Sequence, residues 1–322
     1  MVETAGHSDR GGLTSAGAPA GRTQLDRALG ALYGLAIGDA LGMPAQEMPR
    51  ERAQEILGTP PDFRDGPDDN EISRGLPAGT ITDDTMQCLV LAQQLIEGRG
   101  QLDPIRFAEA LIAWQEDMAD RGRGDLLGQT TRRALAALVA GEDPATTGRG
   151  GTTNGAAMRI TPVGIANTLE RLHDAVIAAD RLTHDTAVAH AGAAVVATVV
   201  SAGVDGATFA EAAPLAIRAA RQFGFGELYE RPGQFATGVE TAESVPTAFA
   251  IARIANGDVW RACTAAVELG GDTDTIAAIA GAMVGACTGL SRLPEDAVRK
   301  VRGANHLDVE PIARGLLDLR DR

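Results

Sequence analysis

Two short acidic segments carry the residues best suited to chemistry. Thr82–Thr85 reads Thr-Asp-Asp-Thr, and Gly270–Thr275, roughly 190 residues further along, reads Gly-Gly-Asp-Thr-Asp-Thr. Each segment directly precedes an apolar pattern with helical spacing, so each is expected at a helix start. Carboxylates in a first helical turn complement the helix dipole, and a single cluster would favour this capping role. Two clusters with the same Thr/Asp pattern favour one shared site.

Four carboxylates gathered at one point repel one another strongly unless cations lie between them. Asp272 and Asp274 would point about 200° apart on a continuous helix. Gly270 and Gly271 permit unusual backbone angles before the helix, so both carboxylates can turn toward one point. The candidate ligands are all oxygens, without a nearby Cys or His, which indicates Mg²⁺, Mn²⁺ or Ca²⁺ and not zinc. Two cations about 3.5–4 Å apart would suit four carboxylates.

Other catalytic groups have weaker support. The chain has no Gly-x-Ser-x-Gly elbow and no cysteine with a convincing partner, so nucleophilic catalysis is unsupported. His184 stands just before a predicted helix and is a candidate ligand contact, whereas His190 lies in an apolar run and is expected in the core. The loop Gly150–Gly155 lacks the Gly-Lys-Ser/Thr end of a Walker loop. Its glycines could form a backbone nest for a pyrophosphate, or simply a turn.

The composition favours closely packed helices. Of the 322 residues 44% are hydrophobic and only 3% aromatic, and Ala, Leu and Gly dominate. The formal charge of −14, with scattered arginines and almost no lysine, argues against binding to nucleic acid. Cys88, Cys263 and Cys287 are odd in number and lie in apolar contexts. They are expected to be buried thiols in a reducing compartment, so we expect a cytoplasmic protein.

No membrane span is expected. The two longest apolar stretches, Ala187–Ala202 and Thr275–Leu290, have about 16 residues each, fewer than the roughly 20 that cross a bilayer. Gly281 and Gly285, spaced by four, are expected to let one buried helix approach another closely.

We predict a disordered tail over residues 1–23 and a single all-α domain over residues 24–322, because no linker or solenoid repeat divides the chain. Residues 59–77 form a predicted loop, and the aromatic-rich stretch 223–237 is a lid, a base-stacking surface or ordinary packing. Thr82 is the predicted N-cap of the helix after it. Helices are predicted over Gln24–Leu41, Pro49–Leu57, Thr85–Glu97, Asp103–Met118, Asp125–Ala140, Glu170–Arg181, Thr186–Ser201, Phe209–Gln222, Ser244–Ala255, Val259–Leu269, Thr275–Cys287, Glu295–Val301 and Val309–Leu319.

Taken together, five segments resemble the ADP-ribosylglycohydrolase family, which includes the dinitrogenase reductase-activating glycohydrolases. The pair of acidic segments is highly specific in combination, and the glycine-rich pieces are less so. The segments occur in family order from about residue 25 to 290, nearly the whole chain. They are Gly38–Pro44 (Gly-Asp-Ala-Leu-Gly-Met-Pro), Thr82–Thr85, Asn154–Arg159 (Asn-Gly-Ala-Ala-Met-Arg), Thr183-His184 and Gly270–Thr275.

This resemblance implies a compact single-domain multi-helix fold around a dinuclear Mg²⁺ or Mn²⁺ centre. It also implies a hydrolase that cleaves the bond at C1 of the distal ribose in ADP-ribosylated proteins or related small ribosides. The metals would hold the ribose hydroxyls and lower the pKa of an attacking water. The implied metal ligands are Thr82, Asp83, Asp84, Asp272, Asp274 and Thr275. The implied substrate contacts are Asp125, Gly151, Thr152, Asn154, Gly155 and His184.

One position departs from the family pattern. Where the family commonly has a glutamate that can act as base, this chain has Gln46, followed by Glu47. A glutamine side chain can orient a ribose or a water but cannot accept a proton. Either a metal-bound aspartate does the proton work, or Glu47 turns inward, or the substrate differs from ADP-ribosyl-arginine; we prefer the first or the third. The candidate catalytic residues are therefore Asp83, Asp274 and Gln46.

Two functions of other kinds remain open on these residues. A catalytically silent module that binds ADP-ribose or a nucleotide would keep the same ligands, and Gln46 motivates this alternative. A metal-dependent phosphohydrolase is the second, because carboxylate-bridged metals also serve phosphoryl transfer.

Overall fold

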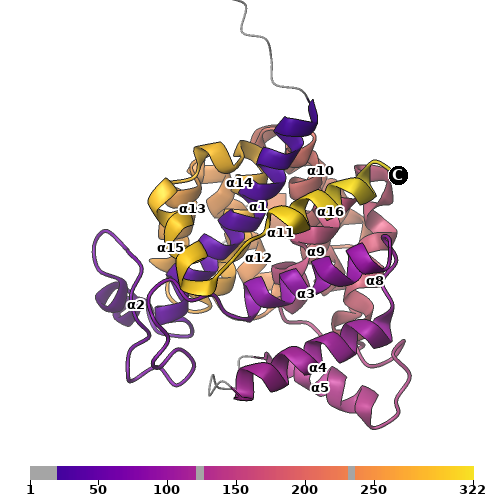
Figure 1. Cartoon of the computed structure of the whole chain (residues 1–322), viewed down its shortest axis with the longest axis horizontal. Helices are drawn as coiled ribbons and strands as arrows, with labels where there is room; N and C mark the ends of the chain where they lie inside the picture. Colours follow the sequence, from indigo (N-terminus) through magenta and orange to yellow (C-terminus); the bar gives the residue numbers. More distant parts are fainter. Residues whose placement is uncertain (1–19, 121–126, 231–235) are drawn as a thin grey trace, which may run out of the picture.

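The computed structural model describes residues 20–120, 127–230 and 236–322 and folds them almost entirely into helices (Figure 1). These ranges contain no strand, and 70% of the chain is helical, which confirms the predicted all-α single-domain class. Two isolated β-bridges, Met48–Gly271 and Thr153–Glu240, join loops. The helices are α1 (Ala20–Gly42), η1 (Met43–Ala45), α2 (Arg50–Leu57), α3 (Asp83–Glu97), α4 (Pro104–Asp120), α5 (Gln129–Val139), α6 (Gly155–Arg159), α7 (Thr161–Ala166), η2 (Leu169–Arg171), α8 (Leu172–His184), α9 (Ala187–Val204), α10 (Phe209–Gln222), α11 (Glu227–Glu230), α12 (Thr241–Ala255), α13 (Val259–Val267), α14 (Thr273–Thr288), η3 (Leu290–Arg292), α15 (Glu295–Asn305) and α16 (Glu310–Arg320).

Several helix boundaries differ from the sequence-based prediction. Helix α1 begins at Ala20, inside the range predicted as tail, and α3 begins at Asp83, so both carboxylates of the first segment lie in its first turn. Helix α8 continues to His184, which therefore ends one helix as well as preceding the next. Helix α5 begins only after Gly128, whose ψ of 144° is not helical. Asp125 lies outside the described residues.

Helices α1 and α14 lie side by side at the centre of the fold and pack through glycine (Figure 1). A Cβ atom added at Gly34 would stand 2.3 Å from the carbonyl oxygen of Gly281, and one at Gly38 would stand 2.1 Å from that of Ala277. A Cβ at Gly285 would meet the carbonyl oxygen of Gly30 at 2.0 Å. The predicted close approach at Gly281 and Gly285 is thus confirmed. Backbones this close leave no room for a methyl group, so the two helices have fixed register and separation.

Among the residues that the structure describes, two helical segments are long and apolar enough to cross a membrane by length and composition alone, contrary to the expected lengths. They are Thr23–Ala45 and Ala187–Val204, and their apolar windows are 100% and 89% buried inside the fold. Burial on all sides is what an apolar core helix of a folded domain requires. The helices thus serve here as the core around which the others pack.

The aromatic-rich stretch supports ordinary packing over most of its described part. The Phe223 ring stacks on His173 at 4.9 Å between centroids, and Tyr229 meets the edge of Phe249 at 5.7 Å. Phe225 is partly buried against the core, and Phe235 lies outside the described residues. The three cysteines are free and buried, as predicted.

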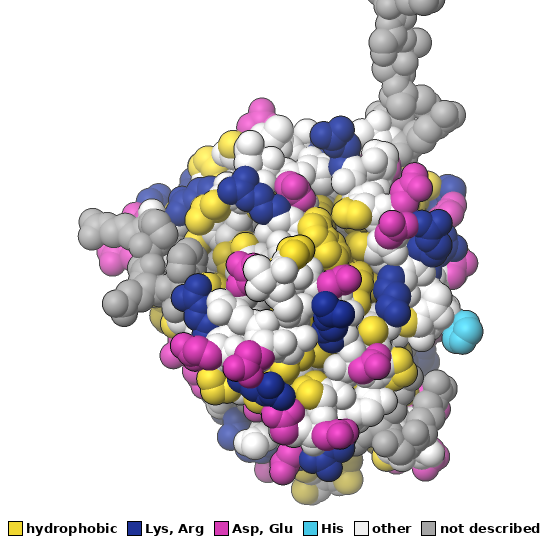
Figure 2. All heavy atoms as spheres, turned by 90° about the vertical axis from the view of Figure 1, so that its left-hand side faces the viewer, with side chains coloured by type: hydrophobic (Ala, Val, Ile, Leu, Met, Phe, Trp, Pro, Cys, Tyr) yellow, Lys and Arg dark blue, Asp and Glu magenta, His cyan; other side chains and the backbone are white. Residues whose placement is uncertain are grey.

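Charge is distributed without a field of one sign on the face that Figure 2 draws, where acidic and basic side chains alternate around apolar ones. The full sequence nevertheless has a formal charge of −14. A surface of this kind offers little attraction to a phosphate backbone.

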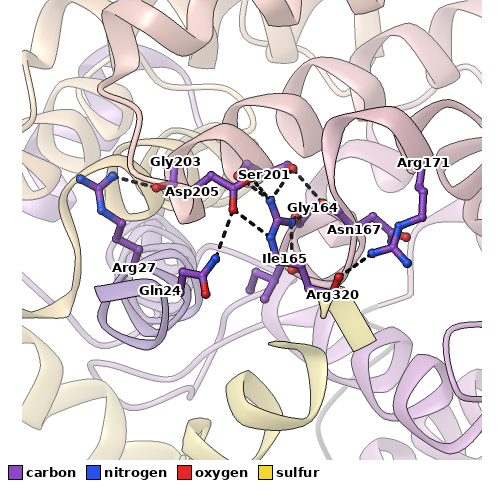
Figure 3. Close-up of polar contacts among 10 residues, drawn as sticks. All are labelled: Gln24, Arg27, Gly164, Ile165, Asn167, Arg171, Ser201, Gly203, Asp205 and Arg320. Carbon is purple, nitrogen blue, oxygen red and sulfur yellow. Dashed lines mark hydrogen bonds and ion pairs between the residues drawn. The ribbon is translucent and has the colours of Figure 1, made fainter. Parts of the chain in front are cut away.

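Besides apolar side chains, the last helix contributes one buried arginine to its contact with the core: Arg320, which is 4% exposed (Figure 3). Its guanidinium donates to the carbonyl oxygens of Gly164 (3.2 Å) and Ser201 (3.1 Å) and pairs with the Asp205 carboxylate. It also donates to the carbonyl oxygen of Asn167. These carbonyls belong to the ends of α7 and α9, where helices leave acceptors unsatisfied. Arg320 therefore supplies the capping of two helices at once.

We expect Arg320→Ala to lower the free energy of unfolding by about 2 kcal/mol, because buried carbonyls and a carboxylate lose charge-assisted partners. The measurement is denaturant unfolding. Arg314→Ala, which removes only an exposed pair with Glu310 on the same helix, is the matched control and should change stability by less than about 0.5 kcal/mol. Equal effects of the two substitutions would contradict the capping role.

Candidate active site

Asp39 organises the first acidic segment although it lies in a different helix. The residue is fully buried in α1, and its carboxylate accepts bonds from the backbone N–H of Thr82 (3.0 Å) and of Thr85 (3.1 Å). The hydroxyl groups of Thr82 (2.8 Å) and Thr85 (2.5 Å) donate to it as well. Thr82 is the N-cap residue of α3, as predicted, but its own side chain makes no capping bond. Asp39 caps α3 from outside and so fixes where its first-turn carboxylates point.

Glycine backbone angles shape the second acidic segment, as expected from its sequence. Gly270 and Gly271 have φ of +73° and +76°, which side chains other than glycine rarely adopt. The turn is fixed by two backbone bonds, from Gly271 N–H to the Met48 carbonyl (2.8 Å) and from Asp272 N–H to the Thr237 carbonyl (2.7 Å). Helix α14 begins immediately after Asp272.

The structure brings the two acidic segments together. The Thr275 hydroxyl donates to the Asp84 carboxylate at 3.4 Å, across a separation of 191 residues. Gly42, at the end of α1, lies directly under the start of α14, because a Cβ there would stand 2.4 Å from the Asp274 nitrogen. The close packing of α1 with α14 therefore places the second segment beside Asp39, which holds the first segment.

Carboxylate burial gives this cluster unusual electrostatics. Asp84 is 1% exposed and Asp274 2%, and each has a buried Oδ1 atom without a hydrogen-bond partner. Burial, and then the charge of neighbouring carboxylates, raises the pKa of Asp83 to about 8 and those of Asp84 and Asp274 well above the ordinary value. Burial also raises the pKa of Asp272 to about 6. Such groups ionise together only if positive charge joins them.

The donor set fits divalent cations. Oxygen ligands in buried carboxylates suit Mg²⁺ or Mn²⁺, and the unpartnered Oδ1 atoms of Asp84 and Asp274 are free acceptors. In the described ranges no Lys or Arg forms an ion pair with the acidic segments. As the described side chains stand, no three acidic, Cys or His groups surround one point. Asp84 Oδ2 and Asp272 Oδ2 accept hydrogen bonds from Thr82 and Asn154. To bind a cation through these oxygen atoms, Asp84 and Asp272 would have to release their hydrogen bonds with Thr82 and Asn154.

Gln46 faces the interior and Glu47 faces solvent. Gln46 is 7% exposed, its backbone carbonyl accepts a bond from the Asn70 side chain (3.0 Å), and its Nε2 atom is buried without a partner. Glu47 has a left-handed φ of 60°, and its N–H donates to the Gly271 carbonyl at 2.7 Å. Its side chain is exposed, although its charge contributes to the raised pKa of Asp272. The structure therefore disfavours the alternative in which Glu47 turns inward.

The glycine- and threonine-rich loop is attached to the second acidic segment. Asn154 donates through Nδ2 to the Asp272 carboxylate (2.5 Å) and to the Ser244 hydroxyl (2.9 Å). Gly151 and Gly155 are buried, whereas Thr152 is exposed. Asn154 thus positions a carboxylate of the cluster, and Thr152 is the accessible member of the predicted substrate contacts.

His184 lies behind the loop, and no part of its side chain is accessible to a ligand as it stands. Its Nδ1 atom is 2.7 Å from the Thr183 hydroxyl and its Nε2 atom 3.0 Å from the Thr153 hydroxyl. A Cβ added at Gly155 would stand 2.8 Å from the ring, so glycine is needed there. His184 therefore supports the loop from behind through its contact with Thr153. A direct contact of His184 with the substrate stays a prediction. Asp125 cannot be placed, since it lies outside the described residues.

Comparison with known proteins identifies the family. The family model described as ADP-ribosylglycohydrolase matches residues 20–322. The chain belongs to the ADP-ribosylglycohydrolase family. A solved structure titled ADP-ribosylglycohydrolase-related protein complex is similar over 92% of this chain and 99% of its own, with a TM-score of 0.74 and 29% identity.

Two relatives align with most of this chain. The ADP-ribosyl-[dinitrogen reductase] glycohydrolase of Rhodospirillum rubrum is 30% identical and aligns over 86% of this chain and 90% of its own. The uncharacterised protein YegU of Escherichia coli (strain K12) is 32% identical, over 92% of this chain and 98% of its own. As a member of the ADP-ribosylglycohydrolase family, the chain is a hydrolase of ADP-ribosyl linkages.

Asp39 is buried at the site, and the sequence did not indicate its role. Asp39 lies within Gly38–Pro44, one of the segments that resemble the family. The motif did not indicate that its carboxylate caps another helix. A usable signal existed, because a carboxylate in the middle of an apolar helix of small residues is expected to be buried only with partners. Those partners, Thr82 and Thr85, lie on another helix and become evident only in the fold.

Proposed function

We propose that this hydrolase cleaves the bond at C1 of the distal ribose in an ADP-ribosylated protein side chain or a related ribosyl compound, with two Mg²⁺ or Mn²⁺ ions. The ions would be held by Thr82, Asp83, Asp84, Asp272, Asp274 and Thr275. The observation that carries this proposal is the convergence of Thr275 and Asp84 at 3.4 Å in a cluster with unpartnered buried oxygens.

The chain's own residues have distinct parts in this reaction. When bound, the divalent cations supply electrostatic stabilisation and lower the pKa of a water for attack at C1. Asp83, which is half-buried in the first turn of α3, and Asp274, which is buried in the first turn of α14, would accept the protons. The cluster's negative charge favours the positive charge that develops on the ribose. Gln46, whose Nε2 atom has no partner within the described chain, would donate a hydrogen bond to the substrate or to a water and takes no proton.

Hydrolysis of an ADP-ribosylated arginine peptide by the purified protein tests this function. We expect release of intact ADP-ribose, its loss on chelation with EDTA and its return with Mg²⁺ or Mn²⁺. Release of AMP or phosphate would support the phosphohydrolase instead. Binding of ADP-ribose without turnover of arginine-, serine- or carboxylate-linked substrates would support the silent module.

Gln46→Glu is expected to change substrate preference. The substitution replaces a buried donor by an acidic group, so it favours a different set of leaving groups and introduces a further potential base beside Asp83 and Asp274. We expect the ratio of kcat/KM for arginine-linked and serine-linked substrates to change about tenfold or more, a difference of about 1.4 kcal/mol in barrier height. The number of bound cations should stay the same. Gln54→Glu, at an exposed position of α2, is the control. Unchanged preference in Gln46→Glu would show that this side chain does not contact the substrate.

A further inference from the structure

A histidine near the start of α9 has a carboxylate on each side of its ring. The Nδ1 atom of His190 is 3.1 Å from Asp180 Oδ2, and its Nε2 atom is 3.1 Å from Asp185 Oδ1. Asp180 belongs to α8, and Asp185 is the first residue after that helix, in the connection to α9. Helices α8, α9 and α10 lie together on one side of the fold (Figure 1). The ring of His190 therefore joins one helix to the start of the next.

Two hydrogen bonds to carboxylates require two hydrogens on this ring. An ionised carboxylate can only accept, and a neutral imidazole carries a single N–H group. With an ionised carboxylate at each nitrogen, the ring must be an imidazolium. Burial lowers the pKa of His190, but the hydrogen bonds and charges of Asp180 and then of Asp185 outweigh burial, so the net shift is upward.

Positive charge around Asp180 favours its ionised form. The residue is 0% exposed, and its Oδ1 atom has no hydrogen-bond partner. Burial raises the pKa of Asp180, and the hydrogen bond and charge of His190, followed by the charge of Arg159, oppose this rise. Arg159 is fully buried in α6 and donates to Gln87 and Thr183. It forms no ion pair in the described part of the chain. His190 is therefore the direct cationic partner of Asp180.

The other neighbours of His190 add no competing positive charge in direct contact. Phe223, at the end of α10, lies 5.6 Å from His190 between ring centroids, a distance at which an aromatic ring can attract a cation. His173 stacks on the same Phe223 ring at 4.9 Å. Burial, and then the charge of Arg159, lowers the pKa of His184. The charged or titratable side chains around the ring are Asp180 and His184 on α8, Asp185 after it, Arg159 on α6 and, beyond Phe223, His173 and Arg218.

The two carboxylates differ in how easily they can lose their bond to the ring. The Asp185 side chain is 26% exposed and the Asp180 side chain 0%. A neutral ring would keep its one N–H on the buried Asp180, because water can solvate only Asp185. Nε2 would then present a lone pair to the Asp185 carboxylate, and the two groups would separate. The backbone N–H of Asp185 donates to the Gly148 carbonyl at 2.8 Å, so the connection itself would loosen.

We propose that His190 is a buried imidazolium that joins Asp180 to Asp185 and acts as a pH-sensitive lock on the connection between α8 and α9. When its proton passes to solvent at alkaline pH, Asp185 is released and Asp180 stays bound. Because the pKa of His190 is raised in the folded protein, the stabilisation is complete below the ordinary value of about 6.5 and is lost as the pH rises through the folded value. The inference is independent of the proposed function, since it needs neither substrate nor cation.

Nitrogen-15 NMR of the imidazole rings in the full-length protein, recorded over a pH titration, tests the number of protons. His190 should carry hydrogen on both nitrogens at pH 6 and lose that on Nε2 with a midpoint above that of an ordinary histidine. Asp185→Asn should lower this midpoint by about one pH unit, because it removes the charge beside Nε2. Asp174→Asn, at an exposed position of α8, should leave the midpoint unchanged. Hydrogen on one ring nitrogen at pH 6, or an equal midpoint in Asp185→Asn and the wild type, would overturn the proposal.

Hydrogen exchange of the Asp185 amide tests the lock. After correction for the intrinsic rate, its protection should fall about tenfold or more as the pH passes through the midpoint of His190. His190→Gln keeps a donor for one carboxylate only and should show low protection at every pH. His306→Asn, at an exposed left-handed position that suits asparagine, should behave as the wild type. If His190→Gln fails to fold, Asp185→Asn should move the fall in protection to lower pH together with the NMR midpoint. Protection of the wild type that does not vary with pH would refute the lock.

Discussion

Asp84→Asn is expected to abolish measurable hydrolysis, with a loss of at least about a hundredfold, because a buried charged ligand of the cluster becomes neutral. The same variant should keep or raise the melting temperature of the metal-free protein. Asp84 is 1% exposed among other carboxylates, so the asparagine removes repulsion at nearly constant volume. The wild type should be stabilised by added Mg²⁺ or Mn²⁺, whereas Asp84→Asn should respond weakly.

Activity and thermal unfolding measured with and without cation check this expectation. Asp318→Asn is the control, since this carboxylate is exposed on α16 and far from the cluster in sequence. It should match the wild type in turnover and in the shift caused by cation. Full turnover by Asp84→Asn, or an unchanged cation response, would remove Asp84 from the proposed ligands.

Gly34→Leu should lower the free energy of unfolding by more than about 3 kcal/mol. Even the first side-chain carbon would stand 2.3 Å from the Gly281 carbonyl oxygen, and this obstacle is backbone and cannot rotate away. Helices α1 and α14 would separate or slide. Since α1 carries Asp39 and α14 carries Asp274, the surviving folded fraction should also lose activity. Denaturant unfolding and turnover per folded molecule are the measurements.

Gly303→Ala provides the matched control for that substitution. Gly303 lies within α15 with no atom within 4 Å of an added Cβ, so the methyl group meets open space. Alanine favours a helix over glycine by up to about 1 kcal/mol, and stability should stay the same or rise. A Gly34→Leu protein as stable as Gly303→Ala would show that the contact between α1 and α14 is not limiting.

The sequence by itself determined most of the helices and the residues that form the acidic cluster. Apolar spacing predicted most helices of the described chain, because that pattern is local. The Thr/Asp repetition around Asp84 and Asp274 indicated one cluster of oxygen ligands, and the structure brings these segments together. Helix ends were less well predicted, as at His184, because terminal turns depend on contacts from elsewhere in the fold.

Only the tertiary structure decided which buried groups support the cluster. Asp39 caps α3 from α1, and Arg159 reaches both Gln87 and Thr183, in each case across helices far apart in sequence. Such partnerships depend on which helices are neighbours and on how closely they approach. The glycine contacts between α1 and α14 set how closely these helices approach. A glycine in one helix indicates that a close contact is possible, but it does not indicate which helix makes that contact.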